Sequence, residues 1–136
     1  MRCRRRVRAQ LMPVNHAYGA LVGQPETLPL DDFHAPRDME PSLWGRVSDA
    51  SAHGPLLIGG PPPTGVAPEV AGSITSAVDE LHSMQLLLDS AVVSGVVDVA
   101  RLRLHAGDAL RHLTAADRGI GALLAAHAKA IARPVR

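Results

Sequence analysis

Apolar and polar positions follow a helical period in the second half of the chain. Between residues 68 and 93, apolar side chains recur every three or four positions, and serine and acidic residues fill the positions between them. This spacing places the apolar side chains on one face of a helix of about six turns. Pro68 suits the first helical turn, and Gly95 suits the end, because glycine adopts the left-handed cap without strain. The pattern predicts an amphipathic helix over residues 68–93.

A second apolar stripe begins directly after this glycine and predicts a helix over residues 96–113. Thr114 and Asp117 have the spacing of a capping box, so a third helix is expected over residues 115–132. If the turn between them is absent, the second and third helices form one continuous rod. The second half of the chain therefore predicts an antiparallel helical hairpin or a three-helix bundle.

Residues 1–67 show neither the helical nor the strand period. Prolines recur through this part of the chain, and each removes a backbone donor and biases the preceding residue toward extended geometry. The segment 54–65 is rich in proline and glycine and is expected to act as a hinge. Two short apolar clusters, 28–33 and 42–47, are expected either to order on a partner or to cover the folded half. The prediction is a mainly α protein, with a disordered Pro/Gly-rich tail over 1–67 and a helical domain over 68–133.

Composition indicates that the helical domain has a thin core. Aromatic residues make up only 2% of the chain, so the core must come from leucine, valine, isoleucine and alanine. A helical domain of about 65 residues lies close to the lower limit for independent stability. Self-association or a protein partner is therefore expected to complete it. The predicted interface consists of the two apolar stripes: Val70, Ile74, Val78, Leu81, Leu88, Val92, Val96, Val99, Leu102, Leu110 and Leu113.

Charge suggests an alternative function. The formal net charge is only +1, so no global field draws the chain toward nucleic acid or membrane. The first eight residues nevertheless contain five arginines, which are suited to weak, non-specific contact with nucleic-acid phosphates: Arg2, Arg4, Arg5, Arg6 and Arg8. No aromatic residue lies among them, which disfavours recognition of single strands.

Candidate catalytic and metal-binding residues are few. His105 and His112 share a helical face with Asp108 between them, but seven residues span about 10.5 Å, too far for two ligands of one ion. Cys3 is the single cysteine, which excludes a disulfide within the chain and a cysteine-based zinc cluster. No serine lies in a nucleophile motif, and segment 54–59 lacks the lysine of a phosphate-binding loop. No catalytic residue, cofactor site or metal site is predicted, and an enzyme is not expected.

The N-terminus contains no apolar stretch suited to a cleaved signal peptide, because polar residues and Pro13 interrupt residues 7–23. Met12 offers an alternative start to Met1. A membrane-spanning helix is not expected, because no run of about 18 apolar residues occurs. A cytoplasmic location, or export without a cleaved signal, is therefore expected.

A proline-containing N-terminus precedes a helix with the run Met84-Gln85-Leu86-Leu87-Leu88, and a second helix follows. This layout resembles the small rod and needle subunits of type III secretion machines over residues 68–113. The resemblance breaks after Leu113, where such subunits usually end. It implies a helical subunit that gains order by assembling. The sequence thus predicts a non-enzymatic protein that acts by self-association or by docking on a protein partner, as a structural subunit of a larger assembly such as a secretion apparatus.

Overall fold

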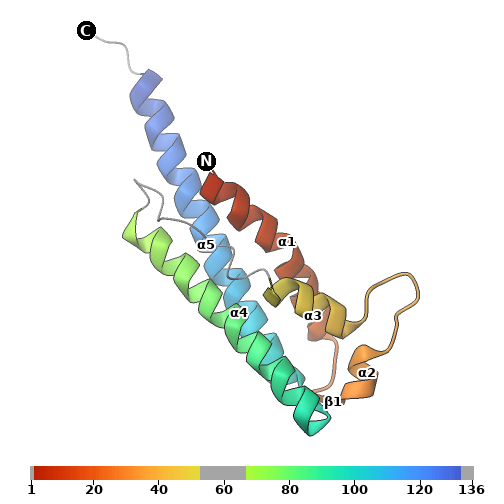
Figure 1. The fold of residues 1–136 in the computed structure, drawn as a ribbon. Coiled ribbons are helices and arrows are strands. Elements are labelled where there is room, and N and C mark those ends of the chain that lie inside the picture. Colours follow the sequence, from red (N-terminus) through yellow and green to blue (C-terminus); the bar gives the residue numbers. More distant parts are fainter. Residues whose placement is uncertain (1, 53–66, 133–136) are drawn as a thin grey trace.

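The computed structural model describes residues 2–52 and 67–132, which form a mainly helical protein (Figure 1). Five helices and two short strands follow one another in this part of the chain. In order they are α1 (Arg2–Val22), β1 (Thr27–Pro29), α2 (Leu30–His34), α3 (Leu43–Ala52), α4 (Pro68–Ser94), β2 (Val96–Asp98) and α5 (Val99–Ala132).

Helices α4 and α5 form the predicted antiparallel hairpin. Pro68 occupies the first turn of α4, and Gly95 ends the helix in the left-handed region with φ 76°. Helix α5 is continuous to Ala132, so the second and third predicted helices are one rod. Thr114 does not cap a new helix, because its hydroxyl donates a 2.7 Å hydrogen bond to the carbonyl of Leu110 one turn earlier.

The prediction of a disordered N-terminal half is wrong, because α1 is a helix of 21 residues. Its buried side chains recur at the helical period and pack on the core: Val7, Val14, Ala17 and Leu21. Pro13 lies inside the helix and removes one backbone hydrogen bond. The free energy gained by burying the apolar stripe outweighs this lost hydrogen bond. The positions of the prolines in the sequence could not show that the helix forms.

Gln10 is a polar residue in the apolar stripe of α1, so the helical pattern of this stripe is difficult to recognise in the sequence. This side chain is buried, and its amide nitrogen donates a hydrogen bond to the carbonyl of Ala50 at the end of α3. Ser51 of α3 in turn accepts a 2.6 Å hydrogen bond from the side chain of Gln85 of α4. Helix α3 is therefore held between α1 and α4.

The two apolar clusters of the first half cover the folded core. Phe33 is fully buried, and Trp44 meets it edge to face with the ring centroids 6.4 Å apart. Ser42 starts α3 by accepting a 3.1 Å hydrogen bond from the backbone of Gly45. The predicted hinge at 54–65 lies outside the described residues.

A two-stranded antiparallel sheet joins the end of α1 to the turn of the hairpin. Thr27 pairs with Asp98, Leu28 with Val97, and Pro29 with Val96. Residues 96–98 form strand β2, with Val97 fully buried, so the predicted second helix starts three residues later than expected, at Val99.

Helices α1 and α4 both run antiparallel to α5 and pack against its earlier turns (Figure 1). Two contacts show the antiparallel direction of α1: Arg4 near its start contacts Asp117 in the second half of α5, whereas Tyr18 near its end contacts Gly107 in the first half. The core fills the space between α1, α3, α4 and α5, and the two predicted parts of the chain share it. The last turns of α5 project past the start of α1 and of α4 (Figure 1).

Candidate functional site

The structure places most of the predicted interface residues inside the molecule. Val78 and Leu110 are half-buried, whereas Val92 and Val96 are 59% and 50% exposed. The other seven are buried in the core: Val70, Ile74, Leu81, Leu88, Val99, Leu102 and Leu113. These seven side chains pack within the chain's own core, which α1 and α3 help to form, so a partner would have to contact other faces.

One such face lies on the outer side of the α4–α5 hairpin. Leu86 and Leu104 are 53% and 60% exposed there, beside a shallow groove of about 280 Å³. Consecutive helical residues point about 100° apart. Leu88 therefore enters the core, while Leu86, two positions earlier, faces outward. The run of three leucines was the signal in the sequence that α4 carries more than one apolar face.

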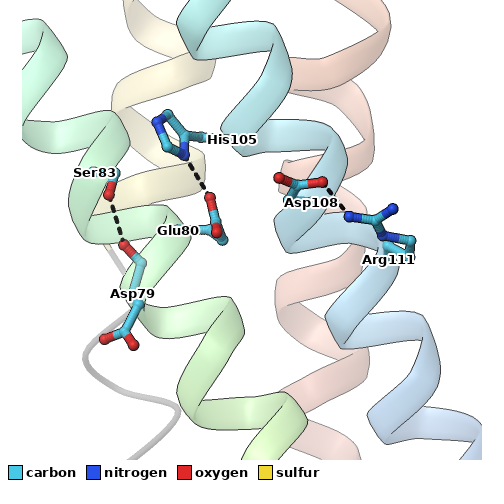
Figure 2. Close-up of polar contacts among 6 residues, drawn as sticks. All are labelled: Asp79, Glu80, Ser83, His105, Asp108 and Arg111. Atoms are coloured by element: carbon cyan, nitrogen blue, oxygen red, sulfur yellow. Dashed lines mark hydrogen bonds and ion pairs between the residues drawn. The ribbon is translucent and has the colours of Figure 1, made fainter.

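Polar side chains of α4 and α5 also lie on the hairpin (Figure 2), and Ser83 and His105 among them line the groove. Glu80 of α4 and His105 of α5 point toward one another, with 2.5 Å between Oε2 and Nδ1. Both side chains are about three-quarters buried, so this pair links the two helices of the hairpin. Asp108 forms an ion pair with Arg111 one turn further along α5.

Each of these polar groups has a separate, local partner. The Ser83 hydroxyl donates a 3.1 Å hydrogen bond to the carbonyl of Asp79 in its own helix (Figure 2). His105 is bound by Glu80 rather than by Asp108. Within residues 2–52 and 67–132, no three histidine, cysteine, aspartate or glutamate side chains gather as a metal site would require.

The arginines of α1 are partly engaged inside the molecule. The Nε atoms of Arg4 and Arg8 donate hydrogen bonds of 3.0 and 2.9 Å to Oδ1 of Asp117. Burial of Asp117 opposes its ionisation, but these hydrogen bonds and the two positive charges outweigh burial and lower its pKa. Arg5 and Arg6 are exposed on the same helix, and Arg2 begins it. The predicted contact with nucleic acid stays a prediction.

The two ends of the bundle carry opposite charge. We define the basic end as residues 3–12, 67–72 and 117–132, which contain six arginine or lysine residues and two acidic ones. The acidic end comprises residues 22–46 and 89–103, with seven acidic residues and four arginines. Sequence order hides this asymmetry, because the fold brings distant segments together at each end.

Both ends also expose apolar side chains. At the acidic end, Val92, Val93 and Val96 surround the Gly95 turn and are 59%, 89% and 50% exposed; we call them the valine turn. At the basic end, residues 125–132 form the α5 projection, in which Ile131 is 70% exposed. Two apolar contact points thus lie at opposite poles of the molecule.

The chain matches no known family model, no curated protein and no solved structure. None of the helices in the described ranges combines the length and apolarity needed to cross a bilayer. The function is therefore inferred from the surfaces of this chain.

Proposed function

We propose that this helical protein is not an enzyme but acts by self-association, and that its copies join head to tail. In this arrangement, the α5 projection of one copy lies against the valine turn of the next copy. The observation that carries the proposal is the coincidence of exposed apolar side chains with opposite charge at the two ends, with Val93 89% and Ile131 70% exposed. Apolar contact supplies attraction, and charge selects the orientation.

Charge disfavours the symmetric alternatives. Pairing two basic ends would bring Arg5, Arg118 and Lys129 of both copies together, and two acidic ends would repel in the same way. Joining the basic end of one copy to the acidic end of another brings opposite charges together. This contact is heterologous, so each added copy leaves one free end of each kind. Copies therefore continue to add unless a ring closes.

The shape of the molecule supports contact at the ends. Helix α5 has 34 residues and α4 has 27, so α5 is longer by about 10 Å at 1.5 Å per residue. Helices α1 and α4 do not cover its last turns, where alanines and Ile131 leave a narrow apolar surface. Small side chains let another backbone approach closely, which suits a packing contact with the short valines of the turn.

The test uses two variants of the full chain, each with one end blocked. Val93→Asp and Ile131→Asp each place a carboxylate in the proposed contact, and both positions are exposed in the single copy, so folding is retained. Sedimentation velocity at low salt should show wild-type mass rising with concentration. Each variant alone should remain a monomer, because a buried unpaired carboxylate is costly.

Mixing the two variants provides the decisive measurement. Each variant keeps one intact end, so an equimolar mixture should form a one-to-one complex that grows no further. Leu104→Asp is the matched control, because Leu104 is exposed on the flank of the hairpin, and this variant should associate like the wild type. A wild type that stays monomeric at high concentration, or a mixture that forms no complex, would overturn the proposal.

A further inference from the structure

A second surface feature, unrelated to the two apolar contact points, lies between α1 and α3. The second half of α1, the loop before α3 and the first turn of α3 surround a pocket of about 530 Å³. We call it the α1–α3 pocket. Its lining is mostly polar: Asn15, His16, Gly19, Ala20, Gly23, Gln24, Arg37, Glu40 and Arg46.

Arg46 is the central group of this pocket. Its side chain is only 20% exposed, and one terminal nitrogen pairs with Glu40 Oε2 at 2.8 Å. The Nε atom of the same guanidinium is buried and has no hydrogen-bond partner among the described residues. A buried N–H of a charged group without an acceptor is costly, and such groups are rare in folded proteins. Because Nε has no solvent-exposed surface in this arrangement, an acceptor oxygen from outside the chain would satisfy it once the guanidinium turns toward the pocket.

The neighbours of Arg46 favour a negatively charged acceptor. Arg37 adds a second guanidinium, and Asn15, His16 and Gln24 add further groups able to donate hydrogen bonds. Glu40 is the single acidic residue of the lining, and Arg46 already neutralises it. The pocket therefore retains a net positive charge.

The backbone holds these groups in place and leaves room above them. A tight turn brings Arg37 and Glu40 together, with 2.6 Å from the Glu40 nitrogen to the Arg37 carbonyl. Asp38 occupies the turn with φ 38°, in the left-handed region that aspartate tolerates better than most residues. On the opposite wall, a Cβ at Gly19 or at Gly23 would meet nothing within 4 Å. The space over this stretch of α1 is open to a small ligand.

We infer that the α1–α3 pocket binds the anionic group, carboxylate or phosphate, of a small molecule, with Arg46 and Arg37 as the principal donors. Arginine suits both groups because its planar N–H donors match the oxygens of either oxyanion. The volume lies within the range of small-molecule sites, and the polar lining favours a small, strongly charged ligand over a large apolar one.

Nuclear magnetic resonance on the full chain tests this inference, because a buried arginine Nε–H group gives its own resonance. Inorganic phosphate and succinate are the two probes, each titrated at constant ionic strength with chloride as the balancing anion. We expect a saturable shift of the Arg46 Nε–H resonance with at least one probe. The relative affinity of the two probes distinguishes a phosphate site from a carboxylate site.

Two variants connect the shift to the pocket. Arg37→Ala should weaken binding by about tenfold, because it removes one of two charged donors. Gly19→Leu should abolish binding by filling the open space without altering Arg46, and an exposed helical leucine leaves the fold intact. Gly72→Leu is the matched control, since Gly72 is an exposed glycine of α4 outside the pocket.

Three results would overturn the inference. The first is the absence of a saturable Arg46 shift with either probe. The second is an equal shift with chloride alone, which would show simple screening. The third is unchanged affinity in Gly19→Leu. The pocket is separate from the apolar contacts proposed for self-association, because Val93 and Ile131 do not line it.

Discussion

Arg4 and Asp117 lie 113 positions apart in the chain, yet the Arg4 Nε atom donates a 3.0 Å hydrogen bond to Asp117 Oδ1. Arg8 donates a second hydrogen bond, of 2.9 Å, to the same oxygen. The contact ties the start of α1 to the second half of α5. It also neutralises part of the positive charge at the basic end, so one carboxylate serves both the fold and the surface.

This contact predicts a dependence of stability on pH. The pKa of Asp117 is lowered in the folded chain, so its ionised form stabilises the fold above the ordinary aspartate pKa of about 3.9. That contribution is lost as the pH falls through the folded pKa. Urea unfolding should therefore show Asp117→Asn less stable than the wild type at about pH 7, with the difference shrinking at about pH 2. Asp89→Asn, an exposed change on α4, should show no comparable difference at either pH.

Close packing of α4 on α5 predicts opposite effects for two glycine substitutions. A Cβ at Gly119 would lie 2.6 Å from Val70 Cγ2, whereas one at Gly72 would meet nothing within 4 Å. Gly72→Ala should raise the free energy of unfolding by about 0.5–1 kcal/mol, since alanine is the better helix former. Gly119→Ala should lower it by about 1–3 kcal/mol, because the helices must separate locally. Equal effects of the two substitutions in urea unfolding would contradict this packing.

The place of α1 in the core predicts unequal effects for two neighbouring residues. Leu21 is fully buried, whereas Val22 is 51% exposed. Leu21→Ala should cost about 2–5 kcal/mol of unfolding free energy, because it leaves a cavity beneath the helix. Val22→Ala should change stability by less than about 0.5 kcal/mol. If residues 1–67 were a flexible tail, thermal unfolding would find both variants indistinguishable from the wild type.

The pair across the hairpin predicts a measurable coupling. Glu80 and His105 are both about three-quarters buried, with 2.5 Å between Glu80 Oε2 and His105 Nδ1. A double-mutant cycle with Glu80→Gln and His105→Gln should give a coupling energy of about 1 kcal/mol in urea unfolding. The same cycle with His112→Gln in place of His105→Gln should give a value near zero. Coupling that is equal in the two cycles would argue against a specific contact.

The sequence determined the elements whose side-chain pattern is uninterrupted. The apolar period from Pro68, and the glycine at position 95, gave α4 and its end to within one residue, because both signals are local. The mainly helical class and the hairpin followed from the same pattern. The continuity of α5 did not, since Thr114 suits a helix start and an internal turn equally, and only its hydrogen bond to Leu110 distinguishes them.

Only the tertiary structure decided what covers these helices. The stripe of α1 is broken by the buried Gln10 and crossed by Pro13, so its helical signal depends on contacts with α3 and α5 that no local pattern reveals. Those contacts bury residues such as Leu81 and Leu102, which the sequence could identify as apolar but could not assign to the chain's own core or to a partner. The same folding sorts charges to opposite ends and brings Arg37 beside Arg46. Local periodicity shows which face of a helix is apolar. Which helix or partner packs on that face depends on long-range contacts.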